Sequence, residues 1–129
     1  MNEEEKKRAI TEYANLQIRL EALAKERDEI LEKIEEIEDT ISSVEEVKEN
    51  LDSLFPIGNG VYCEGKVNEE KFLVNIGAGI LLKLDKEKTI EILIKRIEIL
   101  KKAIEEINEQ MSNIILQQER IANFINKGE

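Results

Sequence analysis

The sequence has 129 residues, of which 37% are charged and only 4% aromatic, and its formal net charge is −10. A chain of this length forms at most one domain, and so few large apolar side chains are a poor basis for a compact globular core. Its acidity gives no electrostatic reason to bind nucleic acid or an anionic membrane surface, so proteins are the expected partners. The chain also has no apolar run of about 18 residues that would span a membrane.

Residues 1–54 carry a heptad pattern that predicts one long coiled-coil helix. The a positions are Tyr13, Leu20, Arg27, Ile34, Ile41 and Lys48, and the d positions are Leu16, Leu23, Ile30, Ile37, Val44 and Leu51. Only Arg27 and Lys48 interrupt this apolar seam. Asn2, with Glu5 three residues later, resembles a capping pair at a helix start. Because the residue before a proline disfavours helical geometry, Pro56 predicts a helix end near Leu54.

Residues 85–129 predict a second helix with the same kind of seam. Its a and d positions are Ile90, Leu93, Ile97, Leu100, Ile104, Ile107, Met111, Ile114, Gln118, Ile121 and Ile125. Asp85 is a suitable N-cap, and Gly128 is a suitable stop.

Neither helix can bury its seam alone, so we expect the two to pair antiparallel. Residues 28–49 hold ten acidic and two basic residues, whereas residues 86–102 hold six basic and three acidic ones. Antiparallel pairing sets these two stretches side by side, where their opposite charges favour that orientation. The two polar seam residues, Arg27 and Gln118, are expected near one level, as a shared polar layer that fixes the register.

Residues 55–84 differ from both flanks and predict two β-hairpins. Four of the six glycines lie in Gly58-Asn59-Gly60 and Gly77-Ala78-Gly79, which are typical of turns. Short β-prone runs surround them at residues 55–57, 61–67, 71–76 and 80–84. The fold class is therefore α+β: a long antiparallel two-helix coiled coil joined by two hairpins, all in one domain.

These hairpins carry more apolar side chains than two helix ends can cover. The residues concerned are Val61, Val67, Phe72, Val74, Ile76, Ile80 and Leu82. Since an isolated hairpin is marginally stable at best, we expect these strands to join strands of other subunits. An intersubunit β-barrel would close the otherwise open strand edges.

No set of nucleophile, base and orienting residue can be assembled, so we expect no enzymatic activity and no cofactor. The chain has no histidine, and the carboxylates of residues 26–39 are spread around a helix without a ligand loop, so we expect no metal site. The glycine pairs lack the lysine and helix context of a phosphate cradle. Cys63 is expected to be a buried strand residue, and a single cysteine favours an intracellular, cytoplasmic location.

Two glycine-containing elements give the sequence a family resemblance. Residues 54–61 read LFPIGNGV and residues 74–80 read VNIGAGI. They resemble the centre of archaeal prefoldin alpha-class subunits, where a VPIGxG element precedes a V-x-[VI]-G-x-G element. Phe55 departs from the valine that the family often has there. The flanking helix lengths also match, so the resemblance covers essentially the whole chain.

The resemblance implies an ATP-independent holding chaperone. It implies a hexamer of two alpha and four beta subunits, whose hairpins form a double β-barrel from which the coiled coils project. The distal ends of the coils would hold non-native proteins and pass them to a group II chaperonin in the cytosol.

On this chain the distal ends correspond to both termini. The expected client-binding residues are Ala9, Ile10, Tyr13, Ala14, Leu16, Ile121, Ala122, Phe124 and Ile125. Ile10 and Phe124 lie off the seam, and apolar side chains at a fraying helix end can bind exposed apolar segments.

Two other functions remain open. The same fold could act structurally, polymerising through its β segment into filaments or scaffolds. The chain could also be a coiled-coil arm of a larger enzyme. A discrete complex of about six chains would favour the chaperone, and an open size distribution would favour the filament.

Overall fold

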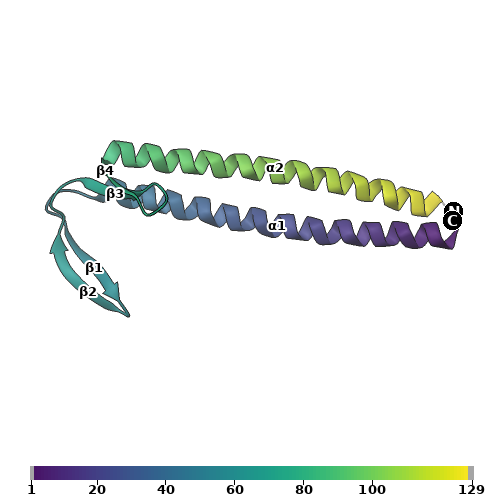
Figure 1. Ribbon diagram of the computed structural model, residues 1–129, viewed down its shortest axis with the longest axis horizontal. Coiled ribbons are helices and arrows are strands. Elements are labelled where there is room, and N and C mark those ends of the chain that lie inside the picture. The colour runs from purple at the N-terminus through teal and green to yellow at the C-terminus, as the bar shows by residue number, and fades with distance from the viewer. Residues whose placement is uncertain (1, 128–129) are drawn as a thin grey trace. The chain divides into compact units, whose positions relative to one another are not determined.

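The computed structural model describes residues 2–127. Helix α1 spans Glu3–Glu46 and helix α2 spans Lys86–Lys127 (Figure 1). The segment of chain that connects them forms four strands: β1 (Asp52–Gly58), β2 (Val61–Lys66), β3 (Lys71–Asn75) and β4 (Leu81–Asp85). The chain divides into two compact units, described separately below. The terminal unit comprises residues up to Ile34 and from Ile99 onward, and the hairpin unit comprises Glu35–Glu98.

In the terminal unit, α1 and α2 pack antiparallel along the predicted seam. The buried side chains there are Ala9, Ile34, Ile107, Ile114 and Gln118. The other predicted seam positions of this unit are half-buried, except Tyr13, which is exposed. The heptad assignment is therefore confirmed in this unit, with Ala9 as one further d position seven residues before Leu16.

Both predicted helix starts are confirmed by capping hydrogen bonds. The backbone N–H of Glu5 donates to Asn2 Oδ1 at 2.8 Å, and that of Lys88 donates to Asp85 Oδ1 at 2.8 Å. Each carboxylate or amide oxygen satisfies one of the amides that the first helical turn leaves unpaired. The predicted stop at Gly128 lies outside the described residues.

The predicted polar layer of Arg27 and Gln118 is wrong. Gln118 Nε2 donates to Gln17 Oε1 at 3.0 Å and to the Tyr13 carbonyl at 3.5 Å. Arg27, ten residues from Gln17 and so about 15 Å along the helix, instead contacts the neighbouring Asp28 carboxylate. The prediction placed Arg27 and Gln118 by their distances from the expected helix ends. Because α1 ends earlier than Pro56 suggested, the actual pairing of α1 with α2 is shifted along the helices.

Helix α1 ends at Glu46, so the prediction of an end near Leu54 is wrong. Asn50 adopts a φ of 67°, its N–H donates to the Val67 carbonyl at 2.7 Å, and the Val67 N–H donates to Leu51 at 3.0 Å. These pairings extend the first hairpin toward the helix and remove Lys48 and Leu51 from the seam. The β segment thus covers residues 52–85 rather than 55–84.

A lysine at the start of α2 caps the C-terminal end of α1. Lys86 Nζ donates to the carbonyls of Glu45 (3.1 Å) and Val47 (2.6 Å). The last turn of α1 contains no basic residue of its own, so this cation satisfies the orphan carbonyls and interacts favourably with the negative end of the helix dipole.

The first hairpin pairs β1 with β2 in a two-stranded antiparallel sheet. Asn59 and Gly60 form its two-residue turn with φ of 48° and 79°, the geometry for which Asn-Gly is preferred. The pairing slips between Pro56 and Gly58, which leaves Ile57 in a bulge. The Phe55 ring covers Gly65 so closely that a Cβ there would lie 2.9 Å from Phe55 Cε2.

The second hairpin pairs β3 with β4 and turns at Gly77-Ala78-Gly79, as predicted. Asn75 Oδ1 accepts the Gly77 N–H at 2.9 Å, and the Ile76 N–H donates to the Ile80 carbonyl at 3.0 Å. Lys83 pairs with Glu69 in the preceding loop, and this hydrogen bond and charge hold the pKa of the Glu69 carboxyl below its usual value.

Candidate functional site

Each unit has a region where exposed apolar side chains lie close together. In the terminal unit Ile10, Tyr13 and Phe124 are exposed near the two ends of the described chain, and further exposed apolar residues, such as Leu31 and Ile115, lie along the helices. In the hairpin unit exposed apolar side chains cover the strands and turns between residues 54 and 82. Contiguous exposed apolar surface of this kind marks an interaction site more often than an inert one.

The terminal surface consists of two grooves, one on each side of the helix pair. The first, the e-side groove, holds about 250 Å³ and is lined by Ile10, Tyr13, Ala122, Ile125 and Asn126. We name it for the heptad position of Ile10 and Ala122, each of which directly follows a d residue. Four of its five lining residues were predicted as client-binding residues.

The second groove, the g-side groove, is more polar. It holds about 280 Å³ and is lined by Ala9, Ile121 and Phe124 together with four charged residues, which are Glu5, Arg8, Glu12 and Arg120. Phe124 is half exposed at heptad position g. The structure thus divides the predicted residues between two sides of the helix pair.

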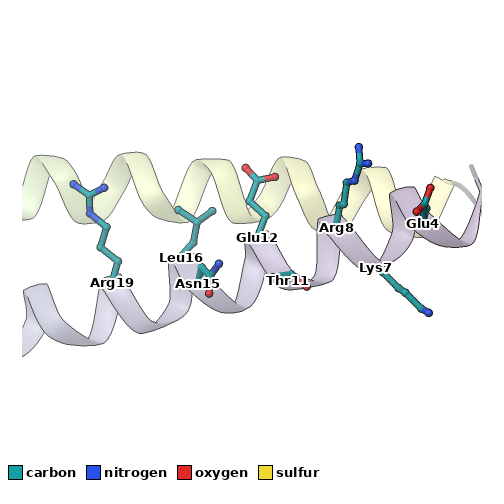
Figure 2. A pocket seen from close by; sticks show the side chains of 8 residues that line it. All are labelled: Glu4, Lys7, Arg8, Thr11, Glu12, Asn15, Leu16 and Arg19. Atoms are coloured by element: carbon teal, nitrogen blue, oxygen red, sulfur yellow. The ribbon is translucent and has the colours of Figure 1, made fainter.

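Ala14 and Leu16 do not line either groove. Leu16 is half-buried in the seam and borders a larger depression of about 610 Å³ along α1. Figure 2 shows this depression, whose side chains are mostly charged, with Lys7 pointing away from Arg8, Glu12 and Arg19. It offers mixed charges rather than an apolar surface.

The first hairpin exposes apolar side chains on both faces. Leu54, Pro56 and Tyr62 share one face by their register, and Phe55 and Cys63 share the other. All five are exposed, as are Ile57 and Val61 near the turn. The expectation that Cys63 is buried is therefore wrong for the chain by itself, because no other element of the hairpin unit covers that strand.

The second hairpin has one covered and one open face. Phe72, Val74, Leu82 and Leu84 are cross-strand partners on the same face. Val74 is only 7% exposed, and Phe72 and Leu84 are half-buried. Arg96 of α2 donates to the Asn75 carbonyl at 2.6 Å, which ties this hairpin to the helix. On the opposite face, Leu73 (68%) and Leu81 are exposed.

The predicted assembly residues therefore occupy different environments. Val74 is covered by the chain itself, Val67 and Phe72 are half-buried, and Val61, Ile76, Ile80 and Leu82 are exposed. Sequence reasoning missed six exposed residues: Leu54, Phe55, Ile57, Tyr62, Leu73 and Leu81. The signal for them was present, because adjacent apolar residues within a strand must point to opposite faces.

Residues 2–127 contain no group of three or more cysteine and acidic side chains placed to hold a metal ion. Neither described helix is long and apolar enough to cross a membrane.

Comparison with known proteins places this architecture in a family. A family model described as "Prefoldin: Prefoldin subunit" matches residues 16–126, which is most of the chain. The chain belongs to the prefoldin family.

Two similar proteins agree with this placement. Over 42 residues the chain is 31% identical to a protein named prefoldin subunit alpha from Picrophilus torridus, and this match covers 33% of the chain and 30% of that protein. The fold also resembles a chain in a cryo-EM structure titled filamentous PFD from Methanocaldococcus jannaschii. That match has a TM-score of 0.71 at 20% identity and covers 91% of this chain and 98% of the other, so it shows a common fold.

The two faces of the second hairpin predict opposite responses in adjacent residues. Val74→Asp should lower the free energy of unfolding by about 3 kcal/mol, because it buries an unpaired charge. Leu73→Asp should change it by less than about 0.5 kcal/mol, because that side chain already faces solvent. Urea unfolding of the isolated chain, followed by circular dichroism, measures both, and equal effects would show that the covered face is misassigned.

Proposed function

We propose that the chain is an alpha-class prefoldin subunit of an ATP-independent holding chaperone, which captures non-native proteins in the grooves of its terminal unit. The observation that carries the proposal is the pair of grooves there, which present Ile10, Tyr13 and Phe124 to solvent. The alpha class is supported by the two hairpins between the helices and by the curated relative.

The grooves suit transient binding of unfolded chains. Each is shallow and has an apolar floor that an exposed apolar segment can cover. A single groove of this size provides only weak affinity, but several subunits held in one complex act together through their effective concentration. Release then needs no ATP, because each individual contact is weak.

The hairpins are the proposed assembly surface. Each is a two-stranded sheet with open edges, and Leu73, Leu81 and Ile80 expose apolar surface that an adjoining strand would cover. We propose that they join hairpins of beta-class subunits in an intersubunit β-barrel, in a complex of two alpha and four beta subunits. Transfer of clients to a group II chaperonin in the cytoplasm completes this proposal.

Two substitutions at the grooves test client capture. Ile10→Ser with Phe124→Ser should abolish most suppression of client aggregation, because each removes a half-exposed apolar side chain from one groove. The matched control is Ile99→Ser, which also alters an exposed isoleucine of the terminal unit but lies in neither groove. Light scattering of a heat-denatured client, with the assembled complex added, gives the measurement.

The control variant should suppress aggregation as well as the unmodified chain does. If the groove variant also retains full suppression while its complex stays intact, the terminal grooves are not where clients bind.

A structural role is the second candidate, and the resemblance to a chain of a filamentous assembly favours it. In that case the exposed hairpins would join copies of this chain without a closed end. Size-exclusion chromatography with light scattering, with and without a beta-class subunit, distinguishes the two. We expect one discrete species of about six chains with the partner, whereas a broad, concentration-dependent size distribution would favour the filament.

A further inference from the structure

The exposed apolar residues of the terminal unit continue beyond the e-side groove along the same side of the helix pair. Leu31 lies 21 residues, or three heptads, after Ile10 on α1, and Ile115 lies seven residues before Ala122 on α2. Residues seven apart in a coiled coil face the same side. Ile10, Leu31 and Ile115 are all about half exposed. We call these three residues, with Ala24 and Ala122, the e flank. The polar residues Gln17, Lys101 and Asn108 occupy the remaining e positions between residues 10 and 31 and between residues 101 and 122.

The opposite side of α1 has a different character. Its g positions in this unit are Glu5, Glu12, Arg19, Glu26 and Lys33, all of them charged. The depression in Figure 2 follows this side and is lined by Glu12 and Arg19. On α1 the g side is therefore charged throughout, whereas the e side carries Ile10, Ala24 and Leu31 with Gln17 between the first two. Packing of the seam does not require this asymmetry.

The border of the e flank is acidic. Around Ala24, a depression of about 470 Å³ is lined by Glu21, Asp28, Glu29 and Glu32 with one cation, Lys25. The four carboxylates outnumber the single ammonium group by three, so these lining residues carry a net charge of −3. Arg27 offsets part of this through its contact with Asp28 at 3.2 Å. On α2, Glu119 stands four residues from Ile115 and so beside it.

We propose that the e flank binds amphipathic helical segments of non-native proteins whose apolar stripe is bordered by lysine or arginine. This inference rests on the proposed holding function and specifies its substrate class. The acidic border attracts a basic segment and disfavours a second copy of this chain, whose net charge is −10. The apolar stripe of the segment would cover Ile10, Ile115 and Leu31.

The backbone of the flank favours a helix over an extended strand as the occupant. Both sides of the flank are α-helices, whose backbone groups are already paired within each helix. An extended segment would find no strand edge to pair with, whereas a helix satisfies its own backbone and packs by its side chains. From Ile10 to Leu31 is about 32 Å along the helix, so a helical segment of about 20 residues spans the flank.

The test measures binding of two synthetic peptides to the full chain by fluorescence anisotropy. Both are amphipathic helices of about 20 residues with identical apolar stripes, one bordered by lysine and the other by glutamate. We expect the lysine peptide to bind at least tenfold more tightly and to weaken as salt is added, because salt screens exposed charges.

Matched variants locate the binding site. Leu31→Ser with Ile115→Ser should weaken binding of the lysine peptide about tenfold, which corresponds to about 1.4 kcal/mol. The control is Ile18→Ser with Leu116→Ser, which removes two apolar residues at position f, away from both flanks. The side chains are comparably exposed: 47% and 43% on the flank, against 65% and 50% in the control. The control should bind as the unmodified chain does.

Equal binding of the two peptides, or equal loss in the two variants, would overturn the proposal. Light scattering would also overturn the proposal if the unmodified chain and the control variant self-associate and the flank variant does not. A second copy of this chain would then be what occupies the e flank. These outcomes are separable from failure of the holding function. If the flank variant binds normally while the Ile10→Ser, Phe124→Ser variant loses aggregation suppression, the holding function stands and only the flank inference fails.

Discussion

The structure depends on one constraint, which is that each helix has a single neighbouring helix along a single seam. Among residues 2–127 no side chain is fully buried, and even the most buried apolar residues, Ile107 and Ile114, retain about 5% of their surface. Two paired helices can shield one stripe of each but cannot enclose a core. The heptad seam therefore uses the apolar residues at a and d, and apolar residues at other helix positions, such as Ile18, Ile99 and Leu116, stay exposed.

The surplus apolar surface is where function is concentrated. In the hairpin unit it lies on strands with open edges, and one hairpin covers Val74 while leaving Leu73 exposed. In the terminal unit it forms two grooves, one of them continued by the e flank. Strand edges suit permanent pairing with other strands, whereas shallow helical grooves suit weak, exchangeable contacts. The same chain thus carries two kinds of surface with different physical properties.

Periodicity predicted most of this fold, and long-range contacts account for what it missed. The seam, the Asn2 and Asp85 caps, the glycine turns and the strand positions could all be predicted because each depends on residues within a few positions of one another. The end of α1 could not, since it depends on Val67 pairing with residues 50 and 51 and on Lys86 reaching the carbonyls of Glu45 and Val47. That early end displaced Gln118 from the expected level of Arg27. Most of the predicted client-binding residues do line the grooves. The side of the helix pair on which each one lies depends on how α1 and α2 are aligned.

The central claim is that clients bind the terminal unit while the hairpins hold the complex together. Hydrogen exchange of the assembled complex, with and without a bound client, tests it most directly. We predict that client binding slows amide exchange in residues 5–20 and 115–127 and leaves residues 52–85 unchanged, since the hairpins would already be paired with other subunits. Slowed exchange confined to the hairpins would contradict the account, because clients would then bind the surface that we assign to assembly.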